Sequence, residues 1–179
     1  MRDFLNIDMN KYLIRDYCPA DLAQVCQQME LFQQYLTDLD TMELLLVDQD
    51  YGIKYTELTL KSVAQQQGEF VVACLAEAPE KVVGFGVGII PQKLFPFDKL
   101  GHKPKKEGIV SELFLLEEYR GRGISRMIIS ELEKHFVAMG CNYCRIGVMK
   151  DNNSAHAAYL KMGYQDRYVE LLRKIGGEN

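Results

Sequence analysis

One short stretch of the sequence, EYRGRGISR at residues 118–126, has residue types and spacing suited to binding a phosphate. It falls between a strand-like segment and an amphipathic helical pattern, so its two glycines lie at the turn into a helix. The first amides of a helix have no partner within the helix, and its dipole favours an anion there. Gly121 and Gly123 allow close approach of a diphosphate, and Arg122 and Arg126 add positive charge at the rim. A tight turn without a ligand is the alternative interpretation.

Two better-known phosphate loops do not fit this stretch. A Walker A loop ends in G-K-[ST] after a longer glycine spacing, and that ending is missing here. A dinucleotide fingerprint needs a third glycine and lies early in the first β-α unit of its fold. The turn therefore indicates a phosphate site of another type.

A second pattern follows at residues 152–164, and the two together resemble the signature motifs of the GNAT family of N-acetyltransferases. The segment from Arg120 to Ser125 is similar to the family's R/Q-x-x-G-x-G/A, with a serine in the final small position. The later segment is similar to N-x-x-A-x-x-x-Y-x-x-x-G-F/Y, with Asn152, Tyr159 and Gly163 in place. The resemblance spans residues 109–165, about a third of the chain. Glu117 and Glu118 depart from the family pattern and place negative charge near the turn.

The resemblance implies an α/β fold: a mixed sheet of six to seven strands flanked by helices, with a splay between the fourth and fifth strands. Residues 1–179 are expected to form a single N-acetyltransferase domain. Residues 1–8 are interpreted as a disordered extension or as a start assigned too early.

The resemblance also implies acetyl-CoA as co-substrate. Its pyrophosphate would lie on the amides at the glycine turn, and its pantetheine arm would pair with the end of strand 109–116, because extended amides can add to a strand edge. A backbone amide near Leu115 would polarise the thioester carbonyl. The implied CoA-binding residues are Phe114, Leu115, Leu116, Arg120, Gly121, Arg122, Gly123, Ile124, Ser125, Arg126 and Asn152.

Two residues are candidates for catalysis. A phenol has a pKa near 10 and a thiol one of about 8.5, so Tyr159 can donate a proton or hydrogen bond to the departing thiolate without being ionised at neutral pH. Its alternative role is a core aromatic residue on its helix. Glu112 lies on the strand beside the expected thioester and is a candidate general base, directly or through water. The alternatives are a charge-paired or solvated strand residue, with loss of the amine's proton to bulk water.

The hydrophobic pattern predicts the elements that position these residues. The order is mixed α/β, and residues 109–149 should form a right-handed parallel crossover. Gly84, Gly86 and Gly88 predict close packing against one face of their strand. Residues 38–66 should hold one or two short helices, and residues 91–107 a long loop. The expected strands are 12–17, 70–76, 81–90, 108–116, 142–150 and 164–175. One helix is expected to start at residues 19–21, with the proline in its first turn, and two others to cover 124–139 and 153–162.

Composition excludes several classes of protein. The chain has 179 residues, of which 47% are hydrophobic, and this suits one domain with a full core. A net charge of −4 gives no sign of the excess positive charge that is typical of nucleic-acid-binding proteins. No apolar run approaches the roughly 20 residues that span a membrane. The acidic N-terminal stretch is unlike an export signal, so a cytoplasmic location is expected. Five cysteines without regular spacing predict reduced thiols, and Cys141-x-x-Cys144 fits strand thiols better than a redox or zinc site, so no metal is expected.

Acidic residues gather in one segment, residues 38–57. Such a cluster would attract a cation, and Tyr51 and Tyr55 could stack on one. A small cationic amine is therefore the expected acceptor, with a protein N-terminus or lysine, or a catalytically silent CoA-binding regulatory domain, as alternatives. The resemblance also allows a homodimer, although no residue indicates one. The acids are Asp38, Asp40, Glu43, Asp48, Asp50 and Glu57, against Lys54 alone.

Overall fold

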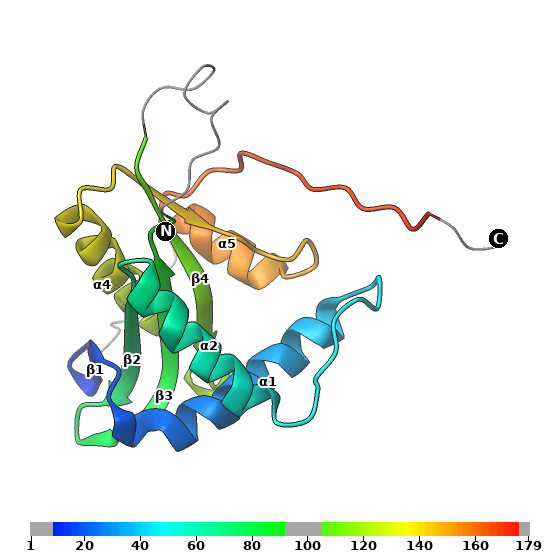
Figure 1. Cartoon of the computed structure of the whole chain (residues 1–179). Helices are drawn as coiled ribbons and strands as arrows, with labels where there is room; N and C mark the ends of the chain where they lie inside the picture. Colours follow the sequence, from blue (N-terminus) through cyan, green and yellow to red (C-terminus); the bar gives the residue numbers. More distant parts are fainter. Residues whose placement is uncertain (1–8, 92–104, 176–179) are drawn as a thin grey trace.

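The computed structural model describes residues 9–91 and 105–175 (Figure 1). The predicted extension at residues 1–8 and most of the predicted 91–107 loop lie outside the described residues. Short 3-10 turns precede β1 and α1 and follow β4. The strands are β1 (Tyr12–Asp16), β2 (Glu69–Leu75), β3 (Ala78–Ile89), β4 (Glu107–Leu115) and β5 (Tyr143–Ile146), and the helices are α1 (Leu22–Leu39), α2 (Tyr51–Gln65), α4 (Ile124–Ala138) and α5 (Asn153–Lys161).

The strands form one mixed sheet in the order β1-β2-β3-β4-β5. The first four run antiparallel to their neighbours, and β5 runs parallel to β4. The predicted strand–helix–strand unit is therefore present, with α4 between two parallel strands. The predicted glycine turn lies at the N-terminus of α4, at Gly123, and Gly140, with φ +79°, follows its C-terminal end.

The prediction of six to seven strands is wrong for the described residues, which contain five. Residues 164–175 were expected to be a strand, but they form an extended segment that leaves the body of the molecule (Figure 1). The predicted strand 142–150 pairs only over Tyr143–Ile146. A strand requires a neighbour that completes its hydrogen bonds, and no described strand lies beside residues 164–175.

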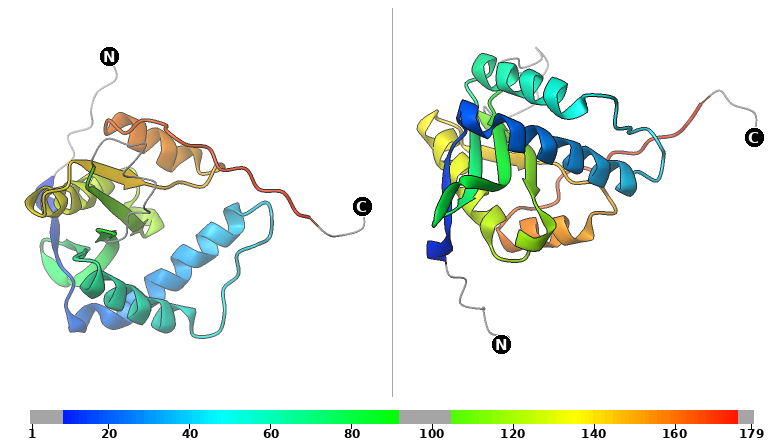
Figure 2. Two further views of the ribbon diagram at one scale, coloured as in Figure 1. Left: turned by 45° about the horizontal axis from the view of Figure 1, so that its top comes forward. Right: turned by 90° about the horizontal axis from the view of Figure 1, so that it is seen from below.

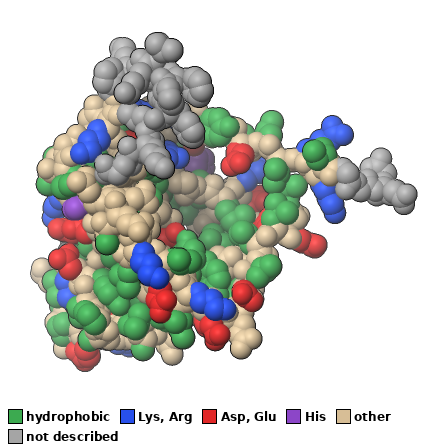
Figure 3. Space-filling model, in the orientation of Figure 1, with side chains coloured by type: hydrophobic (Ala, Val, Ile, Leu, Met, Phe, Trp, Pro, Cys, Tyr) green, Lys and Arg blue, Asp and Glu red, His purple; other side chains and the backbone are tan. Residues whose placement is uncertain are grey.

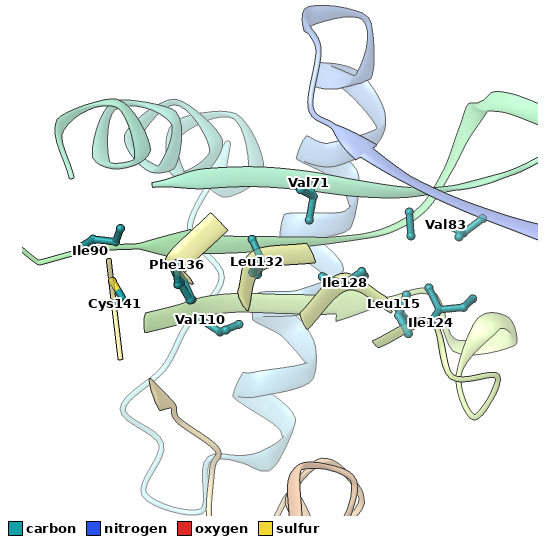
Figure 4. Packing of buried hydrophobic residues seen from close by; sticks show 11 residues of the cluster. Val71, Val83, Ile90, Val110, Leu115, Ile124, Ile128, Leu132, Phe136 and Cys141 are labelled. Carbon is teal, nitrogen blue, oxygen red and sulfur yellow. The ribbon is translucent and has the colours of Figure 1, made fainter. Parts of the chain in front are cut away.

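The sheet separates two hydrophobic clusters. The helix α4 covers one face, and α1 and α2 cover the other (Figure 2). The α4 residues Ile128, Leu132 and Phe136 lie along β3 and β4 (Figure 4). A Cβ atom on Gly86 would collide with the Ile128 side chain, and one on Gly88 would lie 2.7 Å from the Phe136 ring. The predicted close packing at these glycines is confirmed.

Candidate active site

The parallel strands β4 and β5 separate partway along their length. Their pairing covers only Glu107–Val110 of β4 and Tyr143–Ile146 of β5, whereas β4 continues to Leu115. From Ser111 onward, the edge of β4 that faces β5 has no strand partner among the described residues. The open edge leads directly into the glycine turn at the start of α4, so a strand-like ligand could continue the sheet there.

The glycine turn has a backbone that requires glycine at two positions. Gly121 has φ +72° and Gly123, at the N-terminus of α4, has φ +77°. Both angles lie in the left-handed region that side chains rarely adopt. A Cβ atom on Gly121 would have nothing within 4 Å, so the space above the turn is open.

Five consecutive amides at this turn, from Gly121 to Ser125, have no acceptor among the described residues. The first amides with a partner are those of Arg126 and Met127, which donate to the Gly123 carbonyl over 3.1 and 3.3 Å. Unpaired amides at a helix N-terminus, under open space, form an anion site. The turn therefore fits a pyrophosphate.

The three arginines near the turn contact the protein itself. Arg120 donates from Nε to the Leu115 carbonyl over 3.1 Å, and its guanidinium lies 4.9 Å from the centre of the Tyr35 ring. Arg122 donates to the Tyr12 hydroxyl over 3.4 Å, and Arg126 to the Lys161 carbonyl over 3.3 Å. All three side chains are exposed. Arg120 thus links the end of β4 to α1, a role that the sequence did not indicate.

Asn152 lies at the start of α5 and is partly committed to structure. Its Oδ1 accepts hydrogen bonds from the Ala155 amide over 3.2 Å and from the Tyr35 hydroxyl over 3.1 Å. Sequence reasoning missed Tyr35, because the 117 positions between it and Asn152 give no local signal. The side-chain nitrogen Nδ2 of Asn152 has no acceptor among the described residues, so it can still donate to a ligand, whereas the backbone amide donates to the Met149 carbonyl.

Tyr159 is half-buried on α5, and its hydroxyl has no hydrogen-bond partner among the described residues. Burial, with a smaller contribution from Tyr35, raises the pKa of Tyr159 to about 12. The phenol is therefore protonated at neutral pH, and its proton is available to a ligand. This arrangement is compatible with the predicted role of a hydrogen-bond donor.

Glu112 lies on β4, within the part of the strand that has separated from β5. The Tyr55 hydroxyl, on α2, donates to Oε1 of Glu112 over 2.6 Å. Burial raises the pKa of Glu112 to about 7, and the bond from Tyr55 opposes that rise. The ring of Tyr51 stacks on Tyr55 at 5.0 Å with 13° between the planes. A carboxyl group with a pKa near neutrality is suited to proton transfer.

The acidic segment is divided between structural and exposed residues. Asp40 accepts hydrogen bonds from the amides of Met42, Leu44 and Leu45 and so shapes the loop. Asp48 lies 3.9 Å from Lys54, and both side chains are well exposed. Asp50 has a left-handed backbone at the start of α2.

Other expectations concern metals, thiols and membranes. Over residues 9–91 and 105–175, no group of three His, Cys, Asp or Glu side chains could hold a metal ion. The five cysteines are free thiols, and the Sγ of Cys144 lies 3.0 Å from the Tyr164 hydroxyl. No helix in the described part of the chain has the length and apolar character that crossing a membrane requires.

Comparison with known proteins relates the chain to one family of enzymes. The model of the acetyltransferase (GNAT) family matches residues 29–164, about three-quarters of the sequence. An acetyltransferase of Yersinia pestis is 39% identical over 57 residues, which cover 32% of this chain and 40% of that protein. The chain thus matches less than half the length of this curated relative.

Solved structures share the fold over most of their length. A mutant of the BH1408 protein of Bacillus halodurans has a TM-score of 0.75 and 17% identity, covering 91% of this chain and 99% of its own. AAC(6')-Iy, in complex with the bisubstrate analogue CoA-S-monomethyl-acetylneamine, has a TM-score of 0.65 and 16% identity, covering 92% and 99%. With the glycine turn and the separated strands, the family match leads to one conclusion: the chain belongs to the GNAT acetyltransferase family.

Proposed function

We propose that residues 1–179 act as a single N-acetyltransferase domain that moves an acetyl group from acetyl-CoA to a primary amine. One observation carries the proposal: the unpaired amides from Gly121 to Ser125 lie at the end of the unpaired edge of β4. A ligand with a diphosphate joined to an amide-rich arm matches both features at once. Membership of the family supports the same ligand.

In the proposed complex, the turn amides bind the pyrophosphate of acetyl-CoA. Of Phe114, Leu115 and Leu116, it is Leu115 whose amide faces the open edge and pairs with the pantetheine arm, because the Leu116 amide already donates to the Val83 carbonyl on β3 over 3.0 Å. A backbone amide near Leu115 donates to the thioester oxygen and stabilises the negative charge that develops there. The side-chain nitrogen of Asn152 reaches the arm from the side opposite to β4.

The reaction is a direct attack of the amine nitrogen on the thioester carbon. The C–N bond forms, the C–S bond breaks, and the electron pair of that bond leaves on sulfur. Glu112 accepts the proton that the amine loses, because its pKa of about 7 suits proton uptake near neutral pH. Tyr159 acts as general acid at the departing sulfur. Its raised pKa keeps the phenol protonated, and its hydrogen bond to sulfur strengthens as negative charge develops there.

A small cationic amine is the proposed acceptor. The exposed acids Asp48 and Asp50 would attract a cation toward the stacked rings of Tyr51 and Tyr55, and Tyr55 leads to Glu112. AAC(6')-Iy, which shares the fold, was solved with the bisubstrate analogue CoA-S-monomethyl-acetylneamine, and this supports the same class of acceptor. A protein N-terminus or lysine side chain is the second candidate acceptor.

Two measurements test the function. Acetyl-CoA and CoA should raise the melting temperature, whereas NAD and ATP should not, because only a ligand of the folded state stabilises it. Release of free CoA in the presence of a panel of amines then separates an enzyme from a silent CoA-binding domain. Stabilisation by NAD alone would overturn the assignment of acetyl-CoA as the donor. CoA binding without turnover on any amine would indicate a regulatory domain that binds CoA without catalysis.

A further inference from the structure

Tyr35, on α1, contacts both sides of the gap between the separated strands. Its hydroxyl donates to Oδ1 of Asn152, at the start of α5, over 3.1 Å. The guanidinium of Arg120 lies 4.9 Å from the centre of the Tyr35 ring and donates from Nε to the Leu115 carbonyl at the end of β4. Tyr35 therefore joins the β4 side of the proposed donor site to the α5 side.

The arrangement of the helices agrees with these contacts. The C-terminal end of α1 reaches the N-terminal end of α5 in all three views (Figures 1 and 2). The space-filling view shows a hollow between these two helices (Figure 3). A ligand arm that pairs with the open edge of β4 would lie between that strand and Asn152, and Tyr35 contacts residues on both sides of it.

Three donors converge on one atom of Asn152. Its Oδ1 accepts hydrogen bonds from the Ala155 amide over 3.2 Å, from the Ser154 hydroxyl over 3.2 Å and from the Tyr35 hydroxyl. A backbone amide can only donate, so the bond from Ala155 decides that this end of the side chain is the oxygen. Ser154 and Ala155 belong to the first turn of α5, whereas Tyr35 approaches from α1. The bond from Tyr35 therefore fixes the side chain relative to a second helix, and Nδ2 then points in one direction.

Arg120 is held in a similar way. An exposed arginine has many conformations, and fixing one of them costs conformational entropy. Here the guanidinium lies over two rings, at 4.9 Å from the centre of Tyr35 and 5.7 Å from that of Phe114. Together with the bond from Nε to the Leu115 carbonyl, these contacts hold the planar group at the end of β4. Arg120 is thus oriented in the chain by itself, before a ligand binds.

Tyr159 lies near the same residue. After burial, Tyr35 is the second cause of the raised pKa of Tyr159, so the two phenols are close enough to interact. The hydroxyl of Tyr35 is bound to Asn152, whereas that of Tyr159 has no partner among the described residues. The two phenols therefore differ: the hydroxyl of Tyr159 can meet a ligand, and that of Tyr35 orients a neighbour.

We propose that Tyr35 is a positioning residue for the donor: it holds Asn152 and Arg120 so that the pantetheine arm enters a slot whose polar groups are already oriented. This role rests on the proposed function, because it takes acetyl-CoA as the ligand. A group that is oriented before binding loses little conformational freedom when the ligand arrives, so the affinity increases without a new contact. Tyr35 then acts on donor binding, while the acetyl transfer depends on other residues.

Calorimetric titration of the full chain with CoA tests this role. Tyr35→Phe keeps the ring and loses only the hydroxyl, so the dissociation constant of CoA should rise roughly 3- to 10-fold. The KM for acetyl-CoA should rise by a similar factor while kcat changes less than about twofold, because Tyr159 remains protonated. Tyr35→Leu also removes the ring contact with Arg120 and should weaken CoA binding further. Tyr51→Phe is the matched control: it removes the hydrogen bond of a phenol to Gln33 on the same helix, and CoA affinity should not change.

A double-mutant cycle separates this role from general packing. Asn152→Ser removes Nδ2 and keeps a hydroxyl that can cap α5. In that background Tyr35→Phe should have little further effect on CoA affinity, because the hydroxyl acts through Asn152. An equal loss in both backgrounds, or a Tyr35→Phe variant that binds CoA as tightly as the wild type, would overturn the positioning role. A wild-type chain that does not bind CoA would instead overturn the proposed function, and the positioning role with it.

Discussion

The Tyr55 hydroxyl donates a 2.6 Å hydrogen bond to Oε1 of Glu112, joining α2 to the part of β4 that has separated from β5. This contact holds the carboxyl group in one orientation. It also opposes the burial that raises its pKa to about 7, because a hydrogen bond to the ionised form favours that form. The acceptor side of the proposed active site is thus connected to the proposed base through one phenol.

The pH dependence of kcat/KM should follow the ionisation of the Glu112 carboxyl group. A base must be deprotonated to act, so the rate should rise with pH through about 7 and then level off. Glu112→Gln should lower kcat/KM by roughly 10²- to 10⁴-fold and abolish this rise. Full activity with an unchanged profile in Glu112→Gln would assign proton removal to water or to another residue.

Tyr55→Phe tests the positioning role of the phenol. Loss of the Tyr55 hydroxyl removes a hydrogen bond that favours the ionised form of Glu112, so the pKa of Glu112 should increase. The pH at which kcat/KM rises should therefore also increase. Activity should recover at alkaline pH, which a purely structural defect would not produce. A variant with lower activity but the wild-type profile would contradict the positioning role.

Glu112 should also limit stability at alkaline pH. Its folded-state pKa lies above the ordinary value of 4.5, so the folded chain binds more protons than the unfolded chain between those values. Stability should therefore fall as pH rises from about 4.5 to 7. Glu112→Gln should remove this loss, worth roughly 3 kcal/mol at pH 8. Urea unfolding of both proteins at pH 5 and 8 gives the comparison, and an equal pH response would argue against the raised pKa.

Gly123→Val should weaken CoA binding roughly 100-fold. A side chain at this left-handed position shifts the turn, and loss of two hydrogen bonds to a charged phosphate costs about 3 kcal/mol. Gly140→Val is the matched control, because Gly140 has φ +79° at the other end of the same helix. Calorimetric titration with CoA should separate the two. Equal CoA affinities of folded Gly123→Val and Gly140→Val would show that the glycine turn does not bind CoA.

Tyr159→Phe should lower kcat by roughly 10²- to 10⁴-fold while CoA affinity persists, since only the hydroxyl is lost. Tyr164→Phe is the comparison: its hydroxyl binds Glu133 and Cys144 and should affect stability instead of turnover. Steady-state kinetics with thermal melts distinguishes them. Near-normal turnover in Tyr159→Phe would indicate that water, and not Tyr159, protonates the departing thiolate.

Local signals allowed the glycine turn before α4 to be predicted. The turn from Arg120 to Ser125 depends on neighbouring residues, glycine backbone angles and the helix that follows, all of which are readable in one stretch of sequence. The contact between Tyr55 and Glu112 spans 57 positions and depends on how α2 packs on the sheet, so only its members could be named. The segment at 164–175 has a strand's composition, but composition does not show whether a neighbouring strand is present to pair with it.

The acidic residues after α1 provide the last prediction, which concerns capture of a cationic acceptor. Asp48→Asn with Asp50→Asn removes two exposed charges with little change in backbone, because asparagine also tolerates the left-handed conformation of Asp50. With the best amine of the panel, kcat/KM should fall roughly 2- to 10-fold at low salt, and its dependence on ionic strength should flatten. The control is the same charge change elsewhere, Asp16→Asn with Glu131→Gln on β1 and α4. If both pairs of substitutions have equal effects, or if the preferred acceptor is anionic, these acids form a solvated surface and the acceptor is recognised by other residues.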